Sequence, residues 1–265
     1  METSRLTGER IKKYLSQGKR FDGRELDEFR DIVIETGISK NAEGSARVKI
    51  GKTEVIVGVK MEVGTPYPDS PDKGNLMVGA ELTPLSSPRF ELGPPKFPAI
   101  ETGRIIDRII RESKFIETEK LCIKKGEKVW TVMIDIYSVN DDGNILDAAG
   151  IGALAALRTA RMPKYDEEKE KVLFGDWSKN NLPLTKETPV SITLYKVGNK
   201  FIADPNLEEQ DMSEAKITIG RKGEYISSMQ KGDMRPFTIQ EMNQAIEMSE
   251  KVYNDVLKKI DKQLK

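Results

Sequence analysis

Apolar and polar residues alternate most regularly in the middle of the chain, within residues 128–163. From Lys128 to Val139 the pattern is rich in β-branched and aromatic side chains, which predicts a long and largely buried strand. Asp141-Asp142-Gly143 then predicts a turn, and the segment from Ile145 to Arg161 is apolar almost all round. A helix without a polar face has to be buried, so we expect this strand–turn–helix unit to form the centre of the fold.

The start of this predicted helix is a candidate ligand site, because a helix N-terminus can bind an anion. Asn144 is expected to cap the helix, with Asp147 in the acidic position of a capping box. Asp141, Asp142 and Asp147 would surround the turn with carboxylates, which complement the helix dipole and repel a phosphate. The same acids could hold Mg²⁺, but capping explains them without an ion. We therefore interpret the turn as a stabilised helix start and not as an active site.

Elsewhere the periodicity predicts short strands and amphipathic helices. Helices are expected at residues 4–17, at Ala99–Ser113 and after a capping box of Thr238 and Glu241; strands are expected at Ile32–Glu35, at Leu76–Leu82 and in hairpins over Ser45–Val63, Val190–Ala203 and Ala215–Ser228. Residues 166–181 are charged and are predicted to form a loop. These elements make two hairpin sheets, each covered by a helix, which is an α+β layout. We expect residues 1–20 to form an N-terminal helix or arm and residues 21–265 to form a single domain.

Two other segments carry a readable pattern. The C-terminal helix has one apolar stripe, which favours packing on the chain's own sheet over a coiled coil. The stripe consists of Ile239, Met242, Ile246, Ser249, Tyr253, Val256 and Ile260. Residues 64–98 contain eight prolines, and long ordered loops of this kind are usually functional or lie at interfaces.

The helix at Ala99–Ser113 has an informative distribution of charge. Its isoleucines form one face, and Arg104, Arg108 and Arg111 fall at i, i+4 and i+7 on the opposite face. Such a face is usually solvated and crossed by weak ion pairs. Three arginines in one row are also the arrangement that suits a phosphodiester backbone, because guanidinium groups bind phosphate oxygens in a bidentate manner.

Composition narrows the chemistry that is available. The 43 Lys and Arg residues balance 43 Asp and Glu residues, so any basic site has to be local. The chain has no histidine, which excludes histidine-based triads and imidazole metal sites, and its single cysteine, Cys122, excludes a disulfide framework. The polar N-terminus and the lack of a long apolar run predict neither a signal peptide nor a membrane span. We therefore expect a reducing, cytoplasmic location.

The common catalytic motifs cannot be found in this sequence. There is no Walker A motif, no CxxC pair and no HExxH. Residues 150–156 faintly resemble the GLGSSAA phosphate loop of galactokinase-type kinases, but Ala153-Leu154 replaces the serine pair. A small-molecule kinase therefore stays as a minor hypothesis, which ATP binding would favour.

An ordered set of motifs resembles the RNase PH family over nearly the whole chain. The motifs are FDGR with a following Arg30, then GSARVKIGKTEVIVGVKMEV, ETGRIIDRIIRES, the strand-DDGN-helix unit and IADPNLEEQ. Within the family, they look most like the catalytically silent subunit of the archaeal exosome ring. The resemblance implies an RNase PH-type βαβα fold with β-sheets packed on helices. It also implies a ring of six, in which this subunit alternates with a catalytic RNase PH-type subunit under RNA-binding cap subunits, and which degrades RNA from its 3′ end with inorganic phosphate.

The resemblance also carries over residue by residue. Active relatives have a Gly-(Thr/Ser)-Arg-(Thr/Ser) phosphate loop just before the buried helix, where this chain has Asn144-Ile145-Leu146-Asp147. Their catalytic aspartate lies in an Ala-Asp-Met-Pro-like segment, which we match to Asn180-Asn181-Leu182-Pro183, with Asp176 near a second acid. An amide cannot act as a base or an anionic metal ligand. In this subunit type the arginines of the GRxxDRxxR helix help to hold RNA, and they match Arg104, Arg108 and Arg111.

The sequence therefore favours a non-catalytic structural and RNA-binding subunit of a phosphorolytic 3′–5′ exoribonuclease complex. We expect no catalytic residues, no metal and no cofactor in this chain, and single-stranded RNA as its ligand. The alternative is a catalytically active phosphorolytic ribonuclease of the RNase PH type with a rearranged site. Phosphate binding that is lost when Asp141 or Asp142 is changed would support that alternative.

Overall fold

The first half of the chain forms a six-stranded sheet in the computed structural model, which describes residues 3–264. Its strands are β1 (Ile32–Thr36), β2 (Gly44–Ile50), β3 (Thr53–Gly64), β4 (Asn75–Glu81), β5 (Cys122–Lys124) and β6 (Lys128–Asn140). They lie in the order β1-β2-β3-β6-β4, with β5 paired to β6. Only the pair of β4 and β6 in this sheet is parallel, and the other pairs are antiparallel.

The second half forms a smaller, four-stranded antiparallel sheet. Its strands are β9 (Val190–Val197), β10 (Lys200–Ala203), β11 (Ala215–Lys222) and β12 (Tyr225–Gly232), in the order β10-β9-β11-β12. All eight residues of β9 are buried. A strand in which both faces are buried has to be covered on both sides, and this one is.

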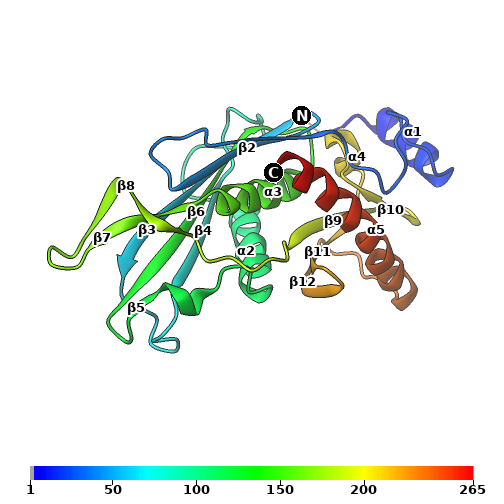
Figure 1. Ribbon diagram of the computed structural model, residues 1–265. Helices are drawn as coiled ribbons and strands as arrows, with labels where there is room; N and C mark the ends of the chain where they lie inside the picture. Colours follow the sequence, from blue (N-terminus) through cyan, green and yellow to red (C-terminus); the bar gives the residue numbers. More distant parts are fainter. Residues whose placement is uncertain (1–2, 265) are drawn as a thin grey trace.

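Two helices, α2 (Phe97–Glu112) and α3 (Ile145–Arg158), lie between the two sheets (Figure 1). Helix α3 packs against β2 and β3 on one side and against β9 on the other. Its small residues make this close approach possible, since an added Cβ at Gly152 would lie 2.6 Å from Val57 and one at Gly150 would lie 2.2 Å from Ser191. The predicted buried central helix is confirmed.

The remaining helices cover the smaller sheet and its edge. Helix α5 (Ile239–Gln263) packs on β9, β11 and β1, and its capping box of Thr238 and Glu241 forms as predicted. Helix α1 (Arg5–Ser16) inserts Ile11 and Leu15 against side chains of β9 and β10. A short helix, α4 (Leu207–Asp211), follows β10, and the 3₁₀ turn η1 (Thr118–Leu121) precedes β5.

The α+β prediction is confirmed, and two details of it are wrong. Residues 166–181 are not a loop, because β7 (Arg161–Asp166) and β8 (Lys171–Asn181) form a third, two-stranded hairpin. Each of the two large sheets is covered by helices, as predicted, and the two sheets share α2 and α3. The first residue of the predicted C-terminal stripe, Ile239, is 78 % exposed. The division of the chain at residue 20 stays a prediction.

Candidate functional site

The three arginines of α2 lie on its exposed side, as the sequence predicts. The opposite side buries Ile105, Ile106, Ile109 and Ile110. An amphipathic helix of this kind is anchored by its apolar face, so its charged face is held in a fixed orientation towards solvent.

The three guanidinium groups differ in what they already bind. Arg104 has no hydrogen bond or ion pair within residues 3–264, and Arg108 donates one 3.3 Å hydrogen bond to the amide oxygen of Gln230 on β12. Arg111 is already paired within the chain, because it binds the carboxylate of Asp107 at 2.7 and 3.1 Å and also donates to a backbone carbonyl of β4. Arg104 and Arg108 are therefore the two arginines of this row without a carboxylate partner in the described residues, whereas Arg111 has only its Nη1 group left for an external anion.

The backbone N–H groups of the turn before α3 bind the chain's own acceptors. The N–H of Asp142 donates to Thr53 Oγ1 at 3.2 Å, the N–H of Gly143 to Asp141 Oδ1 at 3.0 Å, and the N–H of Asn144 to Gln210 Oε1 at 2.8 Å. These three backbone donors of the turn are thus already satisfied, whereas no side chain caps the N–H groups in the first turn of α3 itself. A half-buried carboxylate, Asp141, lies beside them.

Asn144 does not cap α3 with its side chain, so that prediction is wrong. It adopts a left-handed conformation with φ of 57° and is fully buried. Its Nδ2 group donates to two carboxylates, Asp147 at 3.1 Å and Asp204 at 3.0 Å. The amide therefore bridges two acids in the interior and is turned away from the helix end.

Asp147 also points inwards and does not line the turn. It is fully buried and accepts hydrogen bonds from the backbone N–H and the hydroxyl of Thr193 on β9, at 3.0 and 2.8 Å. Burial raises the pKa of Asp147 to about 7, although these hydrogen bonds and the amide of Asn144 favour the ionised form. The expected ring of three carboxylates is thus reduced to Asp141 and Asp142.

Arg30 connects the turn before α3 to Asp204. Its guanidinium binds both oxygens of Asp204, with Nε–Oδ2 of 2.8 Å and Nη2–Oδ1 of 2.7 Å, and donates to the carbonyls of Asp142 and Gly143. Burial alone would raise the pKa of Asp204, but the hydrogen bonds and the charge of Arg30 keep that pKa below its usual value. Asp204 is completely buried, so this pair is an internal connection between distant parts of the chain.

The motifs that carry the family resemblance meet around this pair. Arg24 of FDGR binds Asp204 at 3.1 Å, and Arg20 binds Glu209 through two hydrogen bonds of 2.9 and 2.5 Å. Gly143 packs so closely on the segment after β10 that an added Cβ would lie 2.6 Å from Asn206, and its φ of +85° also favours glycine. These motif residues therefore connect distant parts of the fold in this chain. Sequence reasoning did not assign this role to Asp204, although its place inside the IADPNLEEQ motif was a usable signal.

The segment Asn180-Asn181-Leu182-Pro183, expected to match the catalytic region of active relatives, lies elsewhere. Asn181 pairs with Arg161, and the N–H of Leu182 donates to the carbonyl of Ala160 at 3.3 Å. Both contacts are beyond the C-terminal end of α3, which is about 20 Å from its start for a helix of 14 residues. Asp176 is exposed on the same hairpin. These residues and Asn144 do not form one site.

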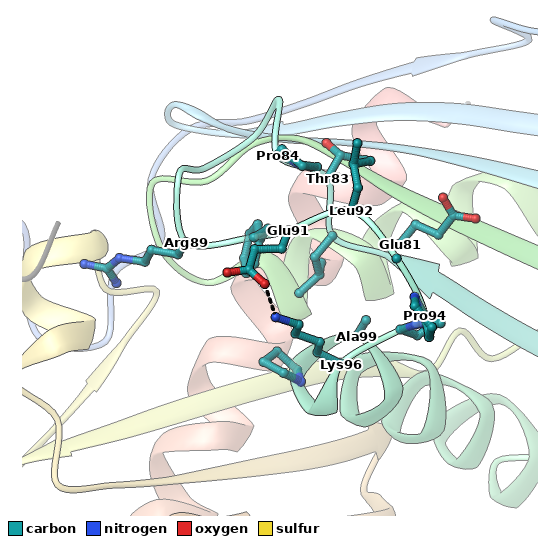
Figure 2. Close-up of a pocket in the computed structure, with 14 residues that line it drawn as sticks. Glu81, Thr83, Pro84, Arg89, Glu91, Leu92, Pro94, Lys96 and Ala99 are labelled. Carbon is teal, nitrogen blue, oxygen red and sulfur yellow. Dashed lines mark hydrogen bonds and ion pairs between the residues drawn. The ribbon is translucent and has the colours of Figure 1, made fainter.

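A groove of about 470 Å³ runs between the start of α3, the exposed side of α2 and the end of β12. Apolar side chains of Phe90, Phe97 and Leu146 line it, together with Gln230 and Lys231. A second cavity, of about 310 Å³, lies under the proline-rich loop (Figure 2). There Glu91 and Lys96 form an ion pair with each other across the loop.

Neither a metal site nor a membrane span is found in the part of the chain that the structure describes. Within residues 3–264, no three Cys, Asp or Glu side chains are grouped so that they could hold an ion. No helix in that range is both long and apolar enough to cross a bilayer.

Fold and sequence together define the class of protein. The chain belongs to the 3′ exoribonuclease family of RNase PH: the model of domain 1 of that family matches residues 28–163, and the model of domain 2 matches residues 187–252. The predicted family is therefore confirmed.

The most similar proteins point to one branch of the family. The exosome complex component Rrp42 of Methanothermobacter thermautotrophicus is 40 % identical over 98 % of this chain and 96 % of its own length. Rrp42 of Thermococcus onnurineus is 46 % identical over 89 % and 87 %. Among solved structures, a chain of the Archaeoglobus fulgidus exosome with RNA bound to the active site is 39 % identical, covers 96 % of this chain and 97 % of that one, and superposes with a TM-score of 0.88.

The raised pKa of Asp147 predicts how stability changes with pH. The unfolded chain releases this proton near pH 3.8 and the folded chain near pH 7, so folding takes up a proton between these values. The contribution of the group to the free energy of unfolding is full below pH 3.8, falls as the pH rises, and is lost above about 7. Asp147→Asn removes this dependence. The free energy of unfolding is measured in urea for the variant and the parent chain at both pH values. We expect the variant's value, relative to that of the parent, to rise by about 2 kcal/mol from about pH 5 to about pH 7.5. A difference between variant and parent that is the same at both pH values would contradict this.

Proposed function

We propose that this chain is a structural and RNA-binding subunit of an exosome core, a phosphorolytic 3′–5′ exoribonuclease complex, and that it has no catalytic activity of its own. The similarity to Rrp42 proteins over almost their whole length supports the assignment to the exosome. The proposal includes a cytoplasmic location and single-stranded RNA as the ligand. It also includes a ring of six, in which this chain alternates with a catalytic RNase PH-type subunit and is covered by RNA-binding cap subunits.

The observation that carries the non-catalytic role is the lack of phosphate-binding side chains at residues 144–147. Phosphorolysis requires inorganic phosphate next to the scissile bond, held by backbone N–H groups, hydroxyls or cations. In residues 144–147 there is neither a hydroxyl nor a cation, and the N–H of Asn144 is bound by Gln210. The nearby carboxylate of Asp141 would repel a phosphate.

The RNA-binding role is supported by Arg104 and Arg108. Both are exposed on a rigid helix, four residues and therefore about 6 Å apart along its axis. Neither is neutralised by a carboxylate within the described residues. Guanidinium groups presented in this way bind phosphate oxygens without reading the bases. Arg111 belongs to the same row, but its pairing with Asp107 predicts a smaller part in RNA binding. We further propose a division of the chain into an N-terminal helix or arm, residues 1–20, and a single domain, residues 21–265.

The absence of intrinsic activity can be tested directly. The purified chain is incubated with single-stranded RNA and inorganic phosphate, alone and together with a catalytic RNase PH-type partner, and the release of nucleoside diphosphates is measured. We expect release only when the partner is present. The partner alone is the control. Phosphate-dependent release by this chain alone would contradict the proposal, and its loss in Asp141→Ala would favour the catalytically active alternative.

A further inference from the structure

One aromatic side chain on the arginine face of α2 has no role in the fold. Phe97, the first residue of α2, is 73 % exposed. It precedes Arg104 by seven residues and Arg108 by eleven, and at 100° per residue all three lie within about 20° of one direction around the helix axis. An exposed phenylalanine in line with two unneutralised arginines combines the two elements of single-strand binding sites, which are cations for the backbone and aromatic rings for the bases.

The surroundings of Phe97 suit a nucleobase better than a phosphate. Phe97 lines the groove of about 470 Å³ beside α2, whose wall also includes Pro98 and Leu146. The wall carries as many carboxylates as cations, so it has no net charge to attract a phosphate, and a neutral base needs none. The carboxylates are Glu101, Asp141 and Asp233, and the cations are Arg89, Lys216 and Lys231. Polar groups suited to the edge of a base are also present, including the amide of Gln230.

The groove is continuous with the arginine row. Gln230 lines it and also accepts the hydrogen bond from Arg108, so the two features share a residue. Lys231, the next residue of β12, lines the groove and donates only to backbone carbonyls among its hydrogen bonds. A strand whose phosphates lie on the arginines would therefore have its neighbouring bases beside Phe97.

We propose that Phe97 is a stacking platform for a nucleobase of single-stranded RNA whose backbone is held by Arg104 and Arg108. This inference rests on the proposed RNA-binding function and adds a residue that contacts bases. Because every base has an aromatic face, the contact strengthens binding without selecting a sequence. The most exposed apolar side chains of the neighbouring loop, Leu85 and Leu92, are poorer platforms because they are aliphatic, and Leu92 lines the other cavity (Figure 2).

The test compares two probes of equal length, an oligoadenylate and an oligonucleotide with the same backbone but without bases. Affinities are measured for the full chain over a range of salt concentrations. We expect Phe97→Ala to weaken oligoadenylate binding about tenfold, with an unchanged salt slope and an unchanged affinity for the abasic probe. Phe97→Trp should retain the affinity of the parent chain, and the matched control Leu92→Ala, at a site 88 % exposed, should have no effect.

Three outcomes would overturn the inference. They are an unchanged affinity of Phe97→Ala for oligoadenylate, an equal loss with both probes, and a loss of assembly with the catalytic partner at unchanged RNA affinity, which would make Phe97 part of a protein interface. Failure of the proposed function looks different. If charge reversal at Arg104 and Arg108 also leaves RNA binding unchanged, the RNA-binding role itself is wrong; if only Phe97→Ala is silent, the stacking contact alone is wrong.

Discussion

Asp204→Asn is expected to lower the free energy of unfolding by about 3–5 kcal/mol. The substitution keeps the size of the side chain but removes the negative charge that neutralises two arginines. Arg30 and Arg24 bind Asp204 at 2.7 and 3.1 Å, and their side chains are only 10 % and 11 % exposed. Arg24 would keep Asp22 at 2.8 Å and Arg30 would keep Asp142 at 3.4 Å, but the network would lose its fully buried carboxylate, which is the costly case for a buried ion pair. Chemical denaturation at neutral pH, where the carboxylate of Asp204 is ionised, measures the loss.

Asp261→Asn is the matched control. Asp261 also pairs with an arginine, Arg158, at 2.6 Å, but its side chain is 46 % exposed. Exposed ion pairs typically contribute about 0–1 kcal/mol, so this variant should unfold almost like the parent chain. Equal losses in Asp204→Asn and Asp261→Asn would show that the internal network does not hold the fold together.

The double variant Arg104→Glu, Arg108→Glu is expected to weaken the binding of single-stranded RNA about a hundredfold at moderate salt. Each arginine that contacts a phosphate contributes about 0.7 to the slope of log affinity against log salt for a single strand, so the slope should fall by about 1.4 or more. The fold should be unaffected, because both side chains are exposed. A salt titration of RNA affinity, together with size-exclusion chromatography of the assembled complex, tests both statements.

Two further variants make this result specific to the arginine row. Arg5→Glu reverses a charge at a 92 % exposed position of α1, away from α2, and should barely change RNA affinity. Arg111→Gln should have a smaller effect than either single reversal, since Arg111 already binds Asp107. If Arg5→Glu weakens binding as much as the double variant, only overall charge matters and α2 has no special part.

Elements defined by local patterns were predictable from the sequence. The apolar run of α3 and the capping box of Thr238 and Glu241 need only neighbouring residues to be recognised, and both form as predicted. The positions of Arg104, Arg108 and Arg111 follow from helical periodicity in the same way, and the structure places all three on one exposed face.

Features that depend on distant partners were not predictable. Asn144 is a residue type that commonly caps helices, but its side-chain amide donates to the buried carboxylate of Asp204, sixty residues later. Asp147 looks like the acid of a capping box, but Thr193 on the second sheet binds it. The charged segment 166–181 lacks an apolar period and still forms strands, because β7 and β8 pair with each other. In each case a tertiary contact outweighs the local preference.

The connection between Arg30 and Asp204 has a consequence for synthesis on the ribosome. A nascent chain that has emerged as far as residue 163 contains six of its strands and both inner helices, but Arg30 lacks Asp204, its closest counter-ion. At about 5–20 residues per second, Asp204 appears a few seconds later, after the second family domain has begun. The larger sheet can form early, but the ion pair between Arg30 and Asp204 cannot fix the turn before α3 until nearly four-fifths of the polypeptide has been made. Chains truncated before Asp204 are therefore expected to be cleaved by proteases more readily than the full chain.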